Sequence, residues 1–212
     1  MNPRLRLEQA RLYLVLEARP NGEAPSALLD AALRGGVDVV QLRDKDLPDD
    51  DLVRAAVAFR RACDAHGALF VLNDRPDLVD ACRADGVHVG QADTSLREAR
   101  AAVGPDRLVG LSIETEAQLD AIAGADYLGV GAVFATPTKT DSVAGGLELV
   151  RATAARVSVP WFAIGGVELA NVTEVVTAGA PGVAVVRAVR DAADPEAAAR
   201  SLRAALGEPP AA

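Results

Sequence analysis

The sequence predicts a single-domain α/β protein, a closed (β/α)8 TIM barrel, and three observations support this fold class. Eight short segments rich in Val, Ile and Leu recur along the 212 residues, with helical patterns between them. The segments are almost continuously apolar, as are the strands of a parallel sheet that is covered on both faces. Eight units in this length average about 26 residues, which suits repeated βα units that share strands. An open, doubly wound sheet is the alternative, but no Gly-rich dinucleotide motif follows the first segment.

Apolar spacing and helix-ending residues place the expected elements along the chain. Strands are expected at 12–16, 37–42, 68–72, 86–89, 108–113, 127–134, 161–164 and 183–186. Helices are expected over 50–65, 95–103, 116–123, 147–157 and 168–178, and most of these are followed by a glycine. Asp194-Pro195-Glu196 begins a further helix, because it combines an N-cap residue, a first-turn proline and a first-turn acid. The single domain covers residues 1–212, and 207–212 is expected to be a frayed tail.

The composition excludes several classes of protein. Lys and Arg number 22 against 30 Asp and Glu, a net charge of −8, which disfavours a nucleic-acid binder. No apolar run is long enough to span a membrane and the first residues do not resemble a signal peptide, so we expect a cytoplasmic protein with no membrane partner. Cys63 and Cys82 are expected to be buried free thiols. The only lysines are Lys45 and Lys139, and all other cationic side chains are arginines.

Polar residues gather where the predicted strands end. In a parallel α/β fold, the carboxyl ends of the strands form the usual site, and helices cover the rest of the sheet. The residues found there are Gln41, Arg43, Asp44, Lys45, Asn73, Asp74, Asp93, Ser112, Glu114, Thr136, Pro137, Thr138, Lys139, Gly165, Gly166, Val186 and Arg187.

The charges in this set predict a magnesium diphosphate. Arg43, Lys45 and Lys139 suit an anion with many oxygens. Asp74 and Asp93 would repel that anion unless a divalent cation lies between them. Mg²⁺ is the expected cofactor, since it binds through one or two carboxylates together with substrate phosphate.

A second phosphate site is predicted at the last two strands. Gly165-Gly166 and the segment 182–187 stand at the usual phosphate position of such barrels, where glycine lets backbone N–H groups approach oxygens. The segment 135–146 is the longest connection and is interpreted as a binding loop or lid.

Several of these residues also have purely structural interpretations. Asp44 could be solvated or paired with a neighbouring cation, and Arg75 could pair locally. His88 lies inside an apolar strand, where a hydrogen-bonded structural histidine is the expected role. His66 precedes Gly67 and is interpreted as a residue that interacts with a helix C-terminus.

In this order, the motifs resemble those of the thiamine phosphate synthase family over essentially the whole chain. The motifs are QLRDK (41–45), NDR (73–75), GVHVGQAD (86–93), GLS (110–112), GVGAVFATPTK (129–139) and AIGGV (163–167). The resemblance implies a Mg²⁺-dependent barrel enzyme that joins hydroxymethylpyrimidine diphosphate to a thiazole phosphate, forming thiamine monophosphate and releasing diphosphate. Its partners would be these small molecules, and a homo-oligomer is compatible with the sequence.

The resemblance also implies roles for individual residues. The run 41–45 with Asn73 and Lys139 would bind the pyrimidine diphosphate, Ser112 would reach the pyrimidine, and Asp74 and Asp93 would hold Mg²⁺. Thr136, Pro137, Thr138, Gly166, Val186 and Arg187 would surround the thiazole phosphate. The catalytic candidates are Arg43, Lys45, Lys139 and Ser112.

Two departures from the family pattern leave alternatives open. Glu114 stands where the family commonly has histidine, and Arg187 where it has a small hydroxyl residue. A potential acid or base at Glu114 keeps a thiazole tautomerase of the same barrel family as an alternative. A non-catalytic binder of phosphorylated metabolites and a sugar-phosphate barrel enzyme are further alternatives.

Overall fold

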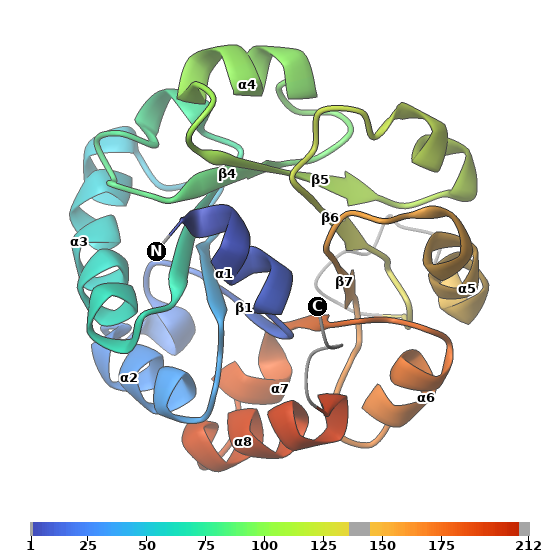
Figure 1. Ribbon diagram of the computed structural model, residues 1–212. Helices are drawn as coiled ribbons and strands as arrows, with labels where there is room; N and C mark the ends of the chain where they lie inside the picture. Colours follow the sequence, from blue (N-terminus) through green and yellow to red (C-terminus); the bar gives the residue numbers. More distant parts are fainter. Residues whose placement is uncertain (1, 136–144, 208–212) are drawn as a thin grey trace.

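The computed structural model describes residues 2–135 and 145–207, and its centre is a closed barrel of eight parallel strands in chain order (Figure 1). The predicted barrel is therefore confirmed, and the open sheet is excluded. The strands are β1 (Leu12–Leu16), β2 (Val39–Leu42), β3 (Leu69–Asn73), β4 (Gly86–Val89), β5 (Leu108–Ile113), β6 (Tyr127–Val130), β7 (Trp161–Ile164) and β8 (Val183–Val185).

Helices surround the barrel, and one short helix crosses one of its ends (Figure 1). This crossing helix is α1 (Pro3–Gln9), which buries Leu7. The other helices are α2 (Ser26–Arg34), α3 (Asp49–His66), α4 (Leu96–Val103), α5 (Gly146–Arg156), α6 (Val172–Thr177), α7 (Arg187–Arg190) and α8 (Pro195–Leu206), with 3-10 turns η1 (Pro20–Gly22), η2 (Pro76–Leu78) and η3 (Glu116–Ala121).

The structure corrects three expected elements. The segment expected to be a helix over 116–123 is the 3-10 helix η3. It begins after a capping box at Thr115 and ends at Ala121 without forming a regular α-helix. The strand expected to reach residue 134 ends at Val130. At the next residue the backbone approaches β7 closely, since a Cβ on Gly131 would be 1.9 Å from the Ile164 carbonyl oxygen. The helix expected from residue 168 begins at Val172.

Side chains alternate along the strands between two apolar layers. Leu12, Leu14 and Leu16 face the helices and belong to the larger cluster, whereas Tyr13 and Val15 face the barrel axis. The axial cluster also contains aromatic rings from β6 and β7, Tyr127 and Phe162. Each strand therefore has one set of positions that points inward, and the site is built from the inward positions nearest the carboxyl ends.

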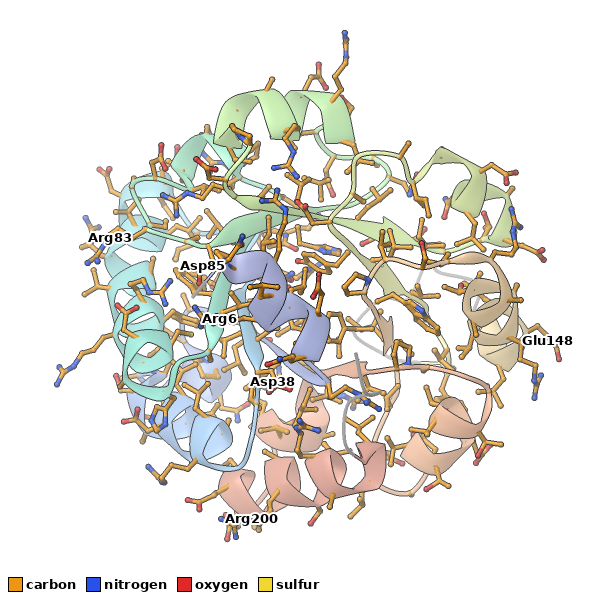
Figure 2. All side chains as sticks on the ribbon, viewed as in Figure 1. Arg6, Asp38, Arg83, Asp85, Glu148 and Arg200 are labelled. Carbon is orange, nitrogen blue, oxygen red and sulfur yellow. The ribbon has the colours of Figure 1, made fainter. Side chains whose placement is uncertain are left out.

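Three aspartates at the opposite, amino-terminal end of the barrel each use the carboxylate in the same way. Asp38, Asp85 and Asp126 each precede an even-numbered strand directly, and each accepts backbone N–H groups at the start of the preceding odd-numbered strand. Figure 2 shows Asp38 and Asp85 on the side of the barrel that α1 covers. Asp126 also pairs with Arg4 of α1 at 3.0 Å. All three carboxylates satisfy strand ends, and Asp126 also ties α1 to the barrel.

No helix among residues 2–135 and 145–207 combines the length and the apolar character needed to cross a membrane.

Candidate active site

A cavity of about 490 Å³ opens at the carboxyl ends of the strands, opposite α1. This size is typical of a small-molecule site. Eleven of the residues that the sequence predicted line it: Gln41, Arg43, Lys45, Asn73, Asp74, Asp93, Ser112, Gly165, Gly166, Val186 and Arg187. Glu114 lines it as well.

One edge of the cavity holds a lysine between two carboxylates. Lys45 Nζ lies 2.8 Å from Asp74 Oδ2 and 3.6 Å from Asp93 Oδ1. Asn73 Nδ2 donates to Asp74 Oδ2 at 2.5 Å, and the Gly90 N–H donates to Asp93 Oδ2 at 3.0 Å. The ends of β2, β3 and β4 thus bring two acids and one compact cation into a single cluster.

The cluster shifts the pKa values of its members. Burial raises the pKa of Asp74; the hydrogen bond from Lys45 opposes this shift and the neighbouring Asp93 adds to it. The hydrogen bond to Asp74 raises the pKa of Lys45. Burial alone would raise the pKa of Asp93, but Asp74, Lys45 and the Gly90 N–H together lower it. The two carboxylates therefore share a site in which a nearby positive charge is needed to keep both of them ionised.

The donor set fits Mg²⁺. Asp74 and Asp93 supply oxygen ligands, and the ammonium of Lys45 already occupies a position between them as a monovalent cation would. Within the described residues, no group of three or more His, Cys, Asp or Glu side chains is arranged to hold a metal. Two carboxylates leave most coordination positions to water and phosphate, which is the usual arrangement for Mg²⁺ at phosphorylated substrates.

The floor of the cavity is a chain of hydrogen bonds across the barrel. Gln41 Nε2 donates to the Tyr13 hydroxyl at 2.8 Å, and the Tyr13 and Tyr127 hydroxyls lie 3.1 Å apart. His88 places Nδ1 3.2 Å from the Tyr127 hydroxyl and Nε2 3.0 Å from Ser112 Oγ. Both ring nitrogens of His88 have partners, as expected of a hydrogen-bonded histidine, but His88 also lines the cavity. Burial raises the pKa of both tyrosines well above the ordinary value.

The opposite side of the cavity is formed by β7, β8 and the residues after them. Gly165 and Gly166 have φ values of +102° and +66°, and a Cβ at Gly166 would lie 2.8 Å from Phe134 Cβ. Both positions require glycine, so this wall presents backbone to the cavity. Arg187 begins α7 at the mouth, where it is exposed.

Some predicted residues lie elsewhere or outside the described part of the chain. Thr136, Pro137, Thr138 and Lys139, with most of the predicted loop 135–146, lie outside the described residues. Asp44 does not line the cavity; its carboxylate accepts the Ala18 N–H at 3.3 Å, in agreement with its structural interpretation.

Other expected structural roles are confirmed for Arg75, which pairs locally with Asp49 and Asp77, and for Cys63 and Cys82, which are buried free thiols. His66 is the last residue of α3, but Gly67 is the C-cap and His66 Nε2 lies 3.6 Å from Asp30 Oδ1, so its interaction with the helix C-terminus stays a prediction.

Residues that line the cavity but were not predicted for it include the inward aromatic residues Tyr13, Tyr127 and Phe162, and Glu17, which pairs with Arg190 at 2.6 Å. Alternation along the strand marks the inward positions, since Tyr13 lies two residues from the inward Val15. An aromatic residue within an apolar strand is typical of core, so this pattern alone does not assign it to a site.

A family model, curated relatives and one solved structure resemble this chain over most of its length. A family model described as thiamine monophosphate synthase matches residues 12–189. The chain is 48% identical to the thiamine-phosphate synthase of Thermobifida fusca over 96% of this chain and 95% of that protein. It is 46% identical to that of Thermosynechococcus vestitus over 99% of this chain, which spans 61% of that longer protein. The solved thiamine phosphate pyrophosphorylase from Pyrococcus furiosus superposes with a TM-score of 0.86 at 32% identity, covering 95% of this chain and 97% of that one.

Proposed function

Since the chain belongs to the thiamine monophosphate synthase family, we propose that it joins 4-amino-2-methyl-5-hydroxymethylpyrimidine diphosphate to 4-methyl-5-(2-phosphoethyl)thiazole. The products are thiamine monophosphate and diphosphate. The observation that carries the proposal is the single cavity in which an acid pair, two cations and a glycine-rich wall face one another. One side offers charge for a diphosphate and the other offers backbone for a phosphate.

The diphosphate belongs on the side of Arg43 and Lys45. Arg43 follows β2, where its backbone N–H donates to Leu16 at 2.8 Å, so the strand end fixes where its guanidinium begins. Lys45 carries a raised pKa and stays protonated, which suits it to neutralise phosphate oxygens. Lys139 is proposed to join them from the segment outside the described residues.

Asp74 and Asp93 would hold Mg²⁺ at the same end. When bound, the ion would neutralise charge on the diphosphate and so make it a better leaving group. The chain's own contribution is to keep both carboxylates oriented, through Asn73 and the Gly90 N–H, and to balance them with Lys45.

The reaction is proposed to proceed by dissociation. The C–O bond to the diphosphate breaks, its electron pair leaves with the diphosphate, and the aminopyrimidine spreads the positive charge left on its methylene carbon. Arg43 and Lys45 stabilise the negative charge that develops on the departing group. The lone pair of the thiazole nitrogen then forms the new C–N bond, so positioning of the two substrates replaces a protein nucleophile.

The thiazole phosphate belongs on the side of Gly166, Val186 and Arg187, together with Thr136 and Thr138 beyond the described residues. Gly166 presents backbone there without a side chain. Arg187 adds a guanidinium where other members of the family are expected to have a small hydroxyl residue. We propose that Arg187 contacts the phosphate directly.

The setting of the activity is also a proposal. The net charge of −8 supports small-molecule substrates and disfavours nucleic acid as a partner. We propose that the protein works in the cytoplasm, where it could act as a homo-oligomer.

A coupled assay for diphosphate release tests the function. We expect release only when both substrates and Mg²⁺ are present, and strong loss in Asp74→Asn and Asp93→Asn. A binder of phosphorylated metabolites would release no diphosphate. A thiazole tautomerase would isomerise its thiazole substrate without magnesium and without the pyrimidine, and would depend on Glu114 rather than on the acid pair.

A further inference from the structure

Five side chains connect the two ends of the cavity floor through the barrel interior. They are Gln41, Tyr13, Tyr127, His88 and Ser112, joined in that order by hydrogen bonds of 2.8, 3.1, 3.2 and 3.0 Å. We call these five residues the relay. Gln41 and Ser112 line the cavity at its ends, and the two tyrosines are almost completely buried.

With the amide nitrogen of Gln41 facing Tyr13, the hydrogen count sets a direction for the relay. Gln41 Nε2 donates to the oxygen of Tyr13, so the Tyr13 hydrogen is directed to Tyr127. The Tyr127 hydrogen is then directed to His88 Nδ1, which must be an unprotonated acceptor. A neutral imidazole with a bare Nδ1 carries its proton on Nε2, so His88 donates to Ser112 Oγ.

The other protonation states of His88 break this chain. If Nδ1 carried a proton, as in the imidazolium or the other tautomer, it would donate to Tyr127, and the Tyr127 hydrogen would be directed to Tyr13. Tyr13 would then accept from both Gln41 and Tyr127, and its own buried hydrogen would have no acceptor within the relay. A buried donor without a partner is costly, so the Nε2-protonated tautomer goes with the amide orientation of Gln41.

The direction of the relay's hydrogen bonds determines which donor and which acceptor a ligand in the cavity can use. With Nε2 of Gln41 engaged by Tyr13, the amide oxygen Oε1 is left to the cavity as an acceptor. With Ser112 Oγ accepting from His88, the serine hydrogen is left to the cavity as a donor. Reversing the Gln41 amide would reverse every bond and exchange the two roles. The relay thus couples an acceptor at one end to a donor at the other.

We propose that Tyr13, Tyr127 and His88 are positioning residues that make the site selective for a 4-aminopyrimidine over a 4-oxopyrimidine. This inference rests on the proposed function and on the family resemblance, which brings Ser112 to the pyrimidine and Gln41 to the pyrimidine diphosphate; it adds that the Gln41 amide contacts the pyrimidine ring itself. An exocyclic amino group donates and a ring nitrogen accepts, which complements Gln41 Oε1 and the Ser112 hydroxyl. An oxo group in place of the amino group would face Gln41 Oε1 as a second acceptor, and relieving that contact would require reversal of the whole relay.

The packing around the relay is built for its rings. Gly110 of β5 lies beneath them: a Cβ there would be 2.2 Å from Tyr127 Cζ and 2.6 Å from His88 Nδ1. A Cβ on Gly129 of β6 would likewise lie 3.2 Å from His88 Cε1. Phe162 packs edge-on against Tyr13 with ring centroids 5.2 Å apart, and contributes no hydrogen bond. Two inward glycines therefore make the room in which the imidazole and the phenol can meet.

The same direction favours the proposed chemistry. As the C–O bond breaks, positive charge spreads onto the exocyclic amino group, and its N–H becomes a stronger donor to Gln41 Oε1. An acceptor held in place by the relay therefore binds the charged state more tightly than the ground state.

A nuclear magnetic resonance measurement on the unmodified enzyme tests the relay independently of activity. The chain has only two histidines, so a sample with ¹⁵N-labelled histidine gives two imidazoles, and His66→Gln identifies which belongs to His88. At neutral pH we expect a bare Nδ1 and a protonated Nε2 in His88. An imidazolium, or the Nδ1-protonated tautomer, overturns the assigned direction even if the enzyme is fully active.

Kinetics then test the selectivity. Tyr127→Phe removes the central hydroxyl, so the Tyr13 hydrogen can be accepted only by the Gln41 oxygen within what remains of the relay. We expect kcat/KM with the aminopyrimidine diphosphate to fall at least about tenfold, and the preference over the 4-oxo analogue to fall at least about tenfold, because the Gln41 amide turns over. The preference is the ratio of kcat/KM for the amino compound to kcat/KM for the oxo compound. The two compounds differ in intrinsic reactivity, but that difference affects both enzymes equally and cancels when the preference of Tyr127→Phe is divided by that of the unmodified enzyme.

Phe162→Leu is the matched control, since it disturbs the same aromatic cluster without removing a hydroxyl. We expect it to leave the amino-to-oxo preference within about twofold of the unmodified value, whatever its effect on stability. An unchanged preference in Tyr127→Phe, or an equal loss in Phe162→Leu, overturns the inference. Absence of diphosphate release by the unmodified enzyme would instead contradict the proposed function.

Discussion

At the scale of single residues, the choice of lysine over arginine is informative. Twenty arginines serve the charged positions of this chain, and a lysine stands at only two, 45 and 139. Lys45 places a compact ammonium between Asp74 and Asp93, where a planar guanidinium would need a wider space. The residue type therefore follows from the geometry of the acid pair.

Lys45→Arg tests this. We expect kcat/KM to fall by at least about tenfold although the charge is kept, because the guanidinium cannot replace the ammonium in this cluster. The same change at Lys139 should also impair turnover. Arg97→Lys on α4, an exposed position, is the control and should leave turnover unchanged. Equal rates for Lys45→Arg and Arg97→Lys would contradict a role for the ammonium at the diphosphate.

Arg187 gives a second prediction at this scale. Its exposed guanidinium at the cavity mouth, one residue after Val186, is proposed to bind the thiazole phosphate. Arg187→Ser should raise KM for the thiazole phosphate about tenfold or more, as expected for the loss of a charge-assisted hydrogen bond, and leave KM for the pyrimidine diphosphate unchanged. Steady-state kinetics with each substrate varied separately provide the measurement, and an unchanged thiazole KM would mean that Arg187 points away from the phosphate.

The charged residues of the site could be predicted from the sequence, whereas the tyrosines of the cavity floor could not. Arg43, Lys45, Asp74 and Asp93 follow strands directly, where a helix-covered sheet gives polar residues no packing role, so their placement could be predicted. Tyr127 could not be assigned in this way, because an aromatic residue within an apolar strand is typical of core. Its role depends on which residues from other strands share its level, and that depends on the register around the barrel.

At the scale of elements, strands were predicted more accurately than helices. All eight strands form where the apolar runs lie, with small differences at their ends. The 3-10 helix η3 differs from prediction because its apolar spacing extends over too few residues for a stable α-helix. The helix α1 was not predicted, since its few apolar residues give no strong period, and its stability comes from contact with the barrel end.

The helix α1 itself offers a matched pair of substitutions. Leu7 is 2% exposed against the barrel interior, whereas Leu5 of the same helix is 52% exposed. Leu7→Ala should lower the free energy of unfolding by about 2–4 kcal/mol, because it removes buried methyl groups and leaves a cavity. Leu5→Ala should change it by less than about 0.5 kcal/mol. Denaturant unfolding measures both, and similar values would show that α1 does not pack on the barrel in solution.

At the scale of the whole molecule, the two ends of the barrel divide stability from function. The amino-terminal end holds Asp38, Asp85 and Asp126, each engaged by backbone N–H groups within the fold. The carboxyl-terminal end holds Asp74 and Asp93, whose closest cation is a lysine assigned to substrate. Carboxylates of the first kind satisfy the fold, and those of the second kind are balanced by a lysine that is itself assigned to the substrate.

The division predicts opposite effects of two aspartate substitutions. Asp126→Ala should cost about 3 kcal/mol, because at a mostly buried position it removes the acceptor of the Val109 N–H and the carboxylate that pairs with Arg4 and Arg100. This corresponds to a fall in Tm of about 6–12 °C, with kcat little changed in the folded protein. Asp80→Ala removes the pair between Arg107 and an Asp80 side chain that is 86% exposed; it is the control and should leave Tm nearly unchanged.

Asp74→Asn should have the opposite effects, a large loss of activity without a loss of thermal stability. Removing one of two neighbouring carboxylates relieves their repulsion, so Tm should stay the same or rise, while diphosphate release falls at least about a hundredfold. Addition of Mg²⁺ with diphosphate should raise the Tm of the unmodified protein and of Asp126→Ala, since both keep the site, but not that of Asp74→Asn. Thermal unfolding with and without these ligands distinguishes the three proteins. A ligand-dependent rise in Asp74→Asn as large as in the unmodified protein would remove the acid pair from the metal site and leave Arg43 and Lys45 to bind the diphosphate alone.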